Sequence, residues 1–304
     1  MYLSIRDDII LAAGYTTLLS GLQDLQIPGV ELRVQRDDTV PAITPDGDRS
    51  RLRLTDPQDL ARLRQQAHTH GITLAALCMG NNFNAPDRDS EIAWAVRTVR
   101  AAQQLGIPVV RVDPIMSGEQ ELPPEERLHR VATALTEILN ATADTSVDLG
   151  VENHGHHGNN PEFLRALLQR VGNPRLGLTL DSGNFYWRGW PLTRVYQIFE
   201  EFAPVVKHTH IKNIAYPPEL REAERAVGYE YGRYVCPIPL GDIDHTRYVA
   251  LLKQAGYDRD LCLEDESLDK YPPEERKANL RAAADAFRTM LTAGTSRLEG
   301  ETKA

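Results

Sequence analysis

Short apolar runs alternate with segments of helical periodicity along the whole chain. A short apolar run bounded by turn residues is typical of a buried strand, and its alternation with helical segments is typical of a parallel sheet covered by helices. The apolar runs cover residues 2–6, 29–34, 71–78, 107–114, 147–153, 176–181, 205–212 and 260–265. We therefore expect eight parallel strands.

The stretches between these runs predict the helices. Thr55 or Asp56 is placed to cap a helix that begins at Pro57, because proline is favoured in the first helical turn. Helices are expected over 15–25, 57–70, 90–105, 123–142, 161–172, from 191 onward, 246–255 and 272–291. Two long insertions, at 35–52 and 213–244, follow the second and seventh strands.

Eight strand–helix units in strict alternation predict an α/β fold, the (β/α)8 TIM barrel, since eight strands close such a barrel. We expect residues 1–292 to form a single barrel domain and residues 293–304 to form a polar tail. The alternative is a doubly wound open sheet, but no GxGxxG or GxxxxGK[ST] motif stands where a nucleotide fold would need it. Both insertions would lie over the carboxyl-terminal mouth of the barrel, where barrels build their active sites.

Composition restricts the class of partner. The 304 residues carry a formal charge of −9 at pH 7, which repels the phosphate backbone of nucleic acids. No apolar run approaches the ~20 residues that would span a membrane. Three scattered cysteines, Cys78, Cys236 and Cys262, form no CxxC pair and favour a reducing cytoplasm. We expect a cytoplasmic protein without nucleic-acid or membrane partners, and a homo-oligomer stays open.

The last four predicted strands each carry, near their carboxyl ends, a side chain that can bind a metal ion. These side chains are Glu152, Asp181, His210 and Glu264. A buried carboxylate is costly without a cationic partner, so three carboxylates and an imidazole predict a site for one divalent ion. Hard oxygen ligands favour Mn²⁺, with Mg²⁺ and Co²⁺ as alternatives, whereas a closed zinc site normally uses more cysteine or histidine. The competing interpretation is that these residues cap helices or pair with arginines.

Further polar residues face the same way as the predicted ligands, because side chains alternate along a strand. On the seventh strand, His208 lies one level deeper than His210, and Lys212 lies at the rim. Arg111 lies on the fourth strand, and His154 follows the fifth. We expect these four residues to contact a substrate. The alternatives are that His154 or His208 orients a metal ligand, that His208 is a core histidine, and that Lys212 and Arg111 form salt bridges at the rim.

A divalent ion held in this way would polarise a substrate carbonyl and hydroxyl and would acidify the neighbouring C–H group. Glu152 and Glu264 come from strands that are apart in the series, so one could remove the proton and the other could return it. We therefore predict that both glutamates are catalytic residues as well as ligands. The expected substrate is a small carbohydrate that passes through an enediolate intermediate.

Several motifs resemble those of the sugar phosphate isomerase/epimerase superfamily, the xylose-isomerase-like TIM barrels. They are VENHG at 151–155, NPRLGLTLDSGNF at 173–185, KHTHIKN at 207–213, PLGDID at 239–244 and GYDRDLCLEDES at 256–267. The resemblance covers nearly the whole chain and implies that Glu152, Asp181, His210 and Glu264 bind one divalent cation. It departs at Asn184, where many ketose epimerases carry a histidine, so Asn184 joins the expected substrate contacts.

The sequence leaves four functions open. The first is a metal-dependent sugar isomerase or epimerase, and the second is a lyase, a dehydratase or eliminase of a keto-sugar or keto-glycoside, on the same site. Both begin with removal of a proton beside a carbonyl and differ only in the fate of the carbanion. An apurinic endonuclease would need more metal-binding histidines and a basic face, which the charge of −9 opposes. A non-catalytic subunit would be favoured by loss of a proton-transfer carboxylate, and both are present.

Overall fold

The eight predicted strands form one parallel sheet that curls into a barrel. A computed structural model describes residues 1–45, 50–118 and 121–293. Strands follow each other around the barrel in the order β12-β1-β2-β5-β6-β7-β8-β9. Their bounds are Tyr2–Arg6 (β1), Gly29–Arg33 (β2), Thr73–Cys78 (β5), Val109–Val112 (β6), Asp148–Glu152 (β7), Leu176–Asp181 (β8), Val206–His210 (β9) and Asp260–Leu263 (β12). Each apolar run of the sequence therefore contains one strand of the barrel.

Backbone contacts between the first and last strands of this order bring the sheet nearly to closure. A parallel bridge joins Ile211, just after β9, to Leu263 of β12. The Ile211 amide donates to the Cys262 carbonyl at 2.8 Å, and the Glu264 amide donates to the Ile211 carbonyl at 2.9 Å. The predicted TIM barrel is thus confirmed, and the doubly wound open sheet is excluded.

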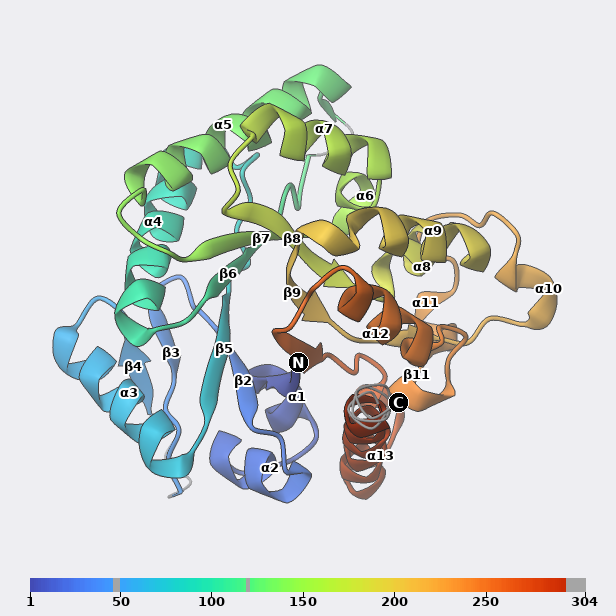
Figure 1. The fold of residues 1–304 in the computed structure, drawn as a ribbon, viewed down its shortest axis with the longest axis horizontal. Coiled ribbons are helices and arrows are strands. Elements are labelled where there is room, and N and C mark those ends of the chain that lie inside the picture. Colours follow the sequence, from blue (N-terminus) through green and yellow to red (C-terminus); the bar gives the residue numbers. More distant parts are fainter. Residues whose placement is uncertain (46–49, 119–120, 294–304) are drawn as a thin grey trace, which may run out of the picture.

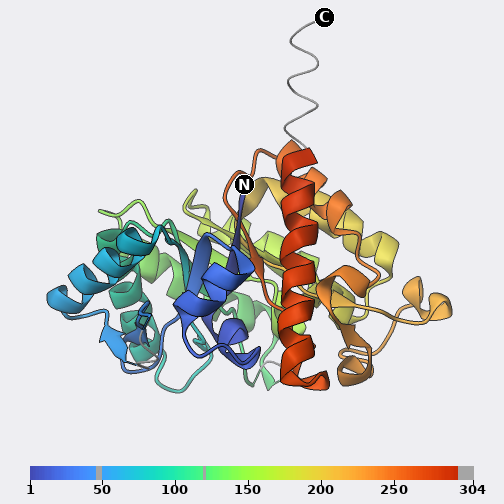
Figure 2. The same ribbon diagram turned by 90° about the horizontal axis from the view of Figure 1, so that it is seen from below.

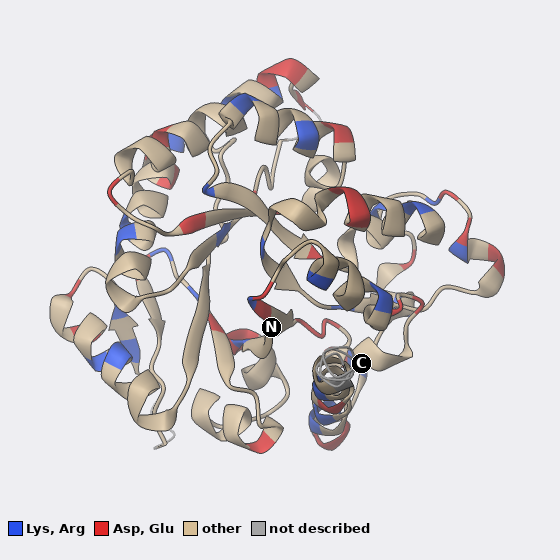
Figure 3. Ribbon diagram, in the orientation of Figure 1, with Lys and Arg blue, Asp and Glu red and all other residues tan. Residues whose placement is uncertain are grey.

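Helices surround the strands, as Figure 1 shows from one end of the barrel and Figure 2 from the side. Acidic and basic positions are interspersed along the outer helices, for example on α13 (Figure 3). Among the described residues, no helix combines the length and apolar character needed to cross a membrane. The helices are Asp7–Ala12 (α1), Leu18–Leu25 (α2), Pro57–His70 (α3), Arg88–Leu105 (α4), Pro124–Ala141 (α5), Gly155–Gly158 (α6), Pro161–Val171 (α7), Asn184–Arg188 (α8), Leu192–Phe202 (α9), Pro218–Arg221 (α10), Tyr231–Tyr234 (α11), His245–Gln254 (α12) and Pro273–Ala293 (α13).

Local capping chemistry explains the helix boundaries that the sequence predicted. Asp56 accepts a hydrogen bond from the Gln58 amide and has proline at the next position, so α3 begins where expected. Asn160 caps α7 in the same way, again before a proline. The predicted tail, 293–304, lies outside the described residues except for Ala293, which ends α13.

Two segments differ from the prediction. The helix expected over 15–25 is shorter, because Thr17 and Ser20 form a capping box that starts α2 at Leu18, and a separate helix, α1, occupies residues 7–12. The first insertion is not merely a loop, since β3 (Thr39–Pro41) and β4 (Arg51–Arg53) pair in an antiparallel hairpin. The sequence did not predict this hairpin because its segment is rich in polar residues.

The second insertion folds over one side of the barrel mouth. It contains an antiparallel pair, β10 (Asn213–Ile214) and β11 (Val235–Cys236), with α10 and α11 between the two strands. The Gly228 amide donates to the Trp187 carbonyl at 2.9 Å, and the Arg225 amide donates to the Gly189 carbonyl at 3.0 Å. The insertion is therefore attached to the α8 segment that follows β8.

Candidate metal and substrate site

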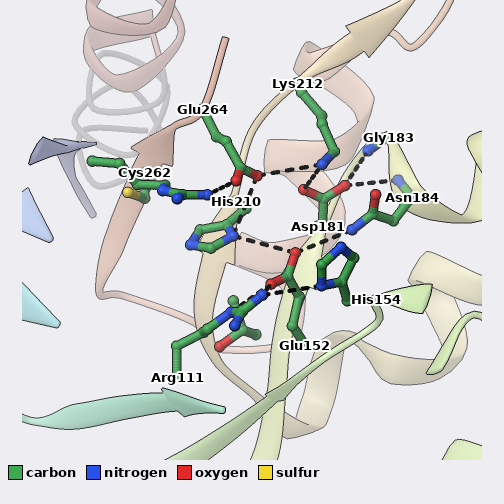
Figure 4. Close-up of polar contacts among 12 residues, drawn as sticks. Arg111, Glu152, His154, Asp181, Gly183, Asn184, His210, Lys212, Cys262 and Glu264 are labelled. Atoms are coloured by element: carbon green, nitrogen blue, oxygen red, sulfur yellow. Dashed lines mark hydrogen bonds and ion pairs between the residues drawn. The ribbon is translucent and has the colours of Figure 1, made fainter. Parts of the chain in front are cut away.

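The structure brings the four predicted metal ligands together at the carboxyl ends of their strands. Glu152 ends β7, Asp181 ends β8, His210 ends β9 and Glu264 follows β12 directly. All four side chains are buried, and each offers a donor atom within 4.8 Å of the others (Figure 4). This set of three carboxylates and one imidazole could hold a divalent ion.

Each of the three carboxylates has one oxygen that is held by the surrounding protein. Arg111 binds Oε2 of Glu152, and Arg6 binds Oε1 of Glu264. The Gly183 and Asn184 amides donate to Oδ1 of Asp181 at 2.8 Å and 2.7 Å. These contacts fix the orientation of each carboxylate, as outer partners of metal ligands do. The competing interpretation was that these carboxylates pair with arginines. Arginine binds only one oxygen of Glu152 and one of Glu264, so the other oxygens remain available to a metal ion.

The remaining donor atoms converge on one point. Oε1 of Glu152 and Oε2 of Glu264 lie 3.4 Å and 3.3 Å from Nδ1 of His210, and Oδ2 of Asp181 lies 3.3 Å from Nζ of Lys212. Within the described residues, Oδ2 of Asp181 and Nδ1 of His210 are buried without a hydrogen-bond partner. Buried polar atoms are rarely left in this state. Their convergence fits a divalent cation.

The pKa shifts at this point show which carboxylates are already compensated by nearby cations. Burial raises the pKa of Glu152, but the charges of Arg111 and His210 outweigh burial and hold this pKa well below its usual value. Burial lowers the pKa of His210, and the charges of Glu31 and Glu152 reverse this effect and raise it. Burial also raises the pKa of Asp181 despite the nearby Lys212. A further positive charge would offset the burial of Asp181.

The second nitrogen of His210 belongs to a network one level deeper in the barrel. Nε2 of His210 lies 2.9 Å from Oε2 of Glu31, and Nε2 of His208 lies 3.1 Å from Oε1 of the same carboxylate. Nδ1 of His208 lies 3.0 Å from Asp260, which accepts a hydrogen bond from Ser4 at 2.5 Å. Glu31 therefore fixes which nitrogen of His210 faces the other ligands.

His208 does not lie where a substrate contact was expected. It is fully buried below the mouth and does not line the cavity there, because Glu31 and Asp260 hold both of its ring nitrogens. The geometry fits both other interpretations of His208, a core histidine paired with Glu31 and Asp260 or a residue that orients His210 through Glu31. Substrate contact by His208 has no support in the structure.

A cavity of about 370 Å³ opens beside Glu152 and Glu264, two of the four predicted ligands. This volume is in the range of small-molecule sites. Three predicted substrate contacts, Arg111, His154 and Lys212, line it together with Glu152 and Glu264. Asn184, another predicted substrate contact, lies in an adjoining hollow and donates from Nδ2 to Oε1 of Glu152 at 3.1 Å.

The sequence analysis did not predict a role at the site for three residues. Arg6 ends β1 and pairs with Glu264, Glu31 lies on β2 and joins both histidines, and Tyr231 of α11 donates a hydrogen bond to Glu266. A signal existed for Arg6, because it stands at the carboxyl end of a strand, as the predicted ligands do. No local pattern marks Tyr231, which lies in the second insertion.

Comparisons with known proteins agree with the fold. The model of the xylose isomerase-like TIM barrel family matches residues 24–290. A solved L-ribulose 3-epimerase is 16% identical with a TM-score of 0.68, covering 100% of this chain and 98% of its own. D-Psicose 3-epimerase with D-tagatose, from Clostridium cellulolyticum H10, is 14% identical with a TM-score of 0.68, covering 96% and 99%. An IolI protein with a binding zinc atom is 19% identical with a TM-score of 0.69, covering 93% and 96%. No curated protein sequence matches the chain.

Proposed function

Starting from the fact that this chain belongs to the xylose isomerase-like TIM barrel family, we propose that it is a divalent-metal-dependent sugar isomerase or epimerase. The convergence of three carboxylate oxygens and Nδ1 of His210 next to a cavity that Glu152 and Glu264 line carries this proposal. Structures of similar fold include sugar 3-epimerases and a zinc-containing protein, which supports both the carbohydrate substrate and the metal.

Glu152, Asp181, His210 and Glu264 would hold the ion. A divalent cation bound there would polarise the substrate carbonyl and stabilise negative charge on the oxygens beside the reacting carbon. We expect Mn²⁺, with Mg²⁺ or Co²⁺ as alternatives, because oxygen ligands outnumber the single imidazole.

The two glutamates move the proton. The Arg111 and His210 charges keep the pKa of Glu152 low despite burial, so this carboxylate is ionised and able to accept a proton from carbon. Glu264 follows β12 and lines the same cavity, so Glu152 takes the proton from carbon and Glu264, in its acid form, gives carbon a different proton. Both glutamates then return to their starting protonation states by exchange with solvent. Arg111 and Arg6 keep the two carboxylates oriented during these steps.

Other residues bind the substrate. Lys212 is buried, and its pKa is raised because the charges of Asp181 and Glu266 outweigh burial, so its ammonium can donate to a developing enediolate oxygen. His154 is held by Asp113 at 2.8 Å and lines the cavity, where it can meet a substrate hydroxyl. Asn184 positions Glu152 through its amide group.

Proton exchange with solvent tests this proposal. Protein reconstituted with Mn²⁺ is incubated with a panel of ketoses and keto-glycosides in deuterated water, and products are read by NMR and mass spectrometry. Deuterium at carbon with an intact skeleton supports an isomerase or epimerase, whereas loss of water or aglycone identifies a lyase instead. Glu152→Gln should lower the exchange rate by about 10²–10⁴-fold. The matched control is Glu162→Gln, at an exposed position in the first turn of α7.

Two outcomes would contradict the assignment. Full exchange in Glu152→Gln would remove Glu152 from proton transfer. No exchange with any panel member, in protein shown to contain one metal ion per chain, would reject the activity as a whole.

A further inference from the structure

A second hollow adjoins the cavity beside Glu152 and Glu264 at the mouth of the barrel. Its volume is about 170 Å³, and it shares His154, Lys212 and Glu266 with the larger cavity. Trp187 and Tyr231 form its remaining walls together with Asn184. The mouth therefore has two adjoining compartments, one beside Glu152 and Glu264 and one whose walls include the aromatic side chains of Trp187 and Tyr231.

The two aromatic walls come from segments that are far apart in the sequence. Trp187 belongs to α8, which follows the strand of Asp181, and Tyr231 belongs to α11 in the second insertion. Backbone hydrogen bonds join the two segments at Gly228–Trp187 and Arg225–Gly189. Gly189 has φ +107°, and a Cβ there would lie 2.1 Å from the Arg225 carbonyl oxygen, so only glycine permits this contact.

The second hollow is linked to the metal ligands by a chain of polar contacts. Tyr231 donates a hydrogen bond to Oε2 of Glu266, and Lys212 donates to Oε1 of the same carboxylate at 2.9 Å. Lys212 in turn lies 3.3 Å from Oδ2 of Asp181. A ligand atom bound near Lys212 therefore stands between the donor atoms of the metal site and the aromatic side chains.

We propose that this hollow is a subsite for a second ring, and that the substrate is a ketose carrying a glycosidically linked sugar. This proposal rests on the proposed function and narrows its substrate class. Trp187 and Tyr231 offer apolar aromatic surface for the C–H face of a pyranose, and Glu266, Asn184 and His154 offer polar partners for its hydroxyls. The larger cavity alone is of a size that accepts a small ligand, so the aromatic compartment extends the site beyond a single sugar.

Binding measurements on the Mn²⁺-loaded protein test the subsite independently of turnover. Fructose is compared by calorimetry with lactulose and isomaltulose, in which the same ketose carries a second ring at different hydroxyls. We expect at least one of the disaccharides to bind about tenfold more tightly than fructose, which is the gain of about 1.4 kcal/mol that an added aromatic contact can supply. Trp187 also provides a fluorescence signal that should change with the disaccharide.

Two variants and a control isolate the aromatic walls. Trp187→Ala and Tyr231→Ala should each reduce the affinity ratio of disaccharide to fructose toward one, and thermal melting shows that each variant is folded. Trp190→Phe is the control, because the Trp190 indole donates to the Asn159 carbonyl at 3.1 Å and does not line the hollow. This variant should keep the ratio of the parent protein.

The outcomes separate the subsite from the activity. Equal or absent binding of both disaccharides relative to fructose overturns the subsite, as does a preference that survives in both alanine variants. Proton exchange with free ketoses but no disaccharide preference leaves the proposed activity standing without the subsite. A disaccharide preference that depends on Trp187 and Tyr231, with no exchange on any sugar, keeps the subsite and rejects the activity.

Discussion

The barrel interior has two polar levels, and they differ in how completely their atoms are paired. At the lower level, every polar side-chain atom of Glu31, His208 and Asp260 has a hydrogen-bond partner. At the upper level, Oδ2 of Asp181 and Nδ1 of His210 have none among the described residues. His210 takes part in both levels, with Nε2 below and Nδ1 above.

This difference in hydrogen bonding suggests different roles for the two levels. A buried polar network that is fully hydrogen-bonded can exist without a ligand. Buried polar atoms that have only ion-pair contacts and no hydrogen bond, as at the upper level, cost free energy until a ligand binds them. The lower level therefore contributes to the fold and to the orientation of His210, and the upper level is the place where we propose that a cation binds. Three substitutions test that division, starting with the largest expected effect, and a fourth concerns a buried histidine outside both levels.

Replacing His208 by glutamine should affect stability far more than metal binding. His208 lies between Glu31 and Asp260, and removing one partner from a buried ionic network costs about 3–5 kcal/mol. Chemical denaturation should show this loss, while calorimetry of the folded variant should show Mn²⁺ affinity close to that of the parent. A stable variant, or one that loses Mn²⁺ binding entirely, would contradict the division between the levels.

Asp181→Asn should affect metal binding far more than stability. The asparagine keeps an oxygen for the Gly183 and Asn184 amides, so the metal-free protein should stay folded with an unfolding midpoint near that of the parent. Mn²⁺ affinity should fall by more than about 100-fold. Loss of a residue that only supports a metal ligand costs at most about that much, and loss of a ligand should cost more. Calorimetry measures the affinity, and unchanged binding would remove Asp181 from the site.

Glu31→Asp tests the connection between the levels. The shorter carboxylate keeps its charge but cannot reach both histidines as Glu31 does, so the orientation of His210 should loosen. Mn²⁺ affinity, again measured by calorimetry, should fall by about tenfold, at the lower end of the effect of losing an outer partner. Affinity equal to that of the parent would show that Glu31 does not position His210.

His245 provides a buried histidine outside both levels. Burial lowers its pKa from 6.5 to about 4, and Ser182 lies 3.3 Å from its Nε2 atom. The folded state thus keeps this ring neutral, and the unfolded state binds a proton below pH 6.5, so stability is complete above that pH and decreases as pH falls toward 4. At pH 5.5 the loss relative to neutral pH should be about 1.4 kcal/mol.

The measurement is the difference in unfolding free energy between pH 7.5 and pH 5.5, in the parent protein and in His245→Gln. The variant should lack the His245 contribution, whereas His129→Gln, at an exposed position of α5, should behave as the parent does. An identical pH dependence in parent and His245→Gln would show that His245 is not the group responsible.

Much of the upper level could be predicted from the sequence because its residues follow a simple rule. Glu152, Asp181, His210 and Glu264 stand at the ends of consecutive apolar runs, and parallel strands bring their carboxyl ends to one edge. The barrel itself followed from the alternation of runs and helices for the same reason. Local periodicity is sufficient to predict the fold wherever each strand or helix packs beside the one that precedes it in the sequence.

The remaining features depend on contacts across the barrel. Glu31 meets His208 from a strand 177 positions away, and no local pattern reveals that the two side chains share one level. Tyr231 reaches Glu266 from an insertion whose path is set by its backbone contacts with α8 rather than by periodicity. For this reason the second compartment, and the exclusion of His208 from the cavity, required the structure.

The position of the metal itself most directly tests whether the upper level is a cation site. Crystals grown with Mn²⁺ and measured near its absorption edge would locate the ion by anomalous scattering. We predict one strong peak bounded by Oε1 of Glu152, Oδ2 of Asp181, Nδ1 of His210 and Oε2 of Glu264. No peak, or a peak at the lower level among Glu31, His208 and Cys262, would contradict this prediction.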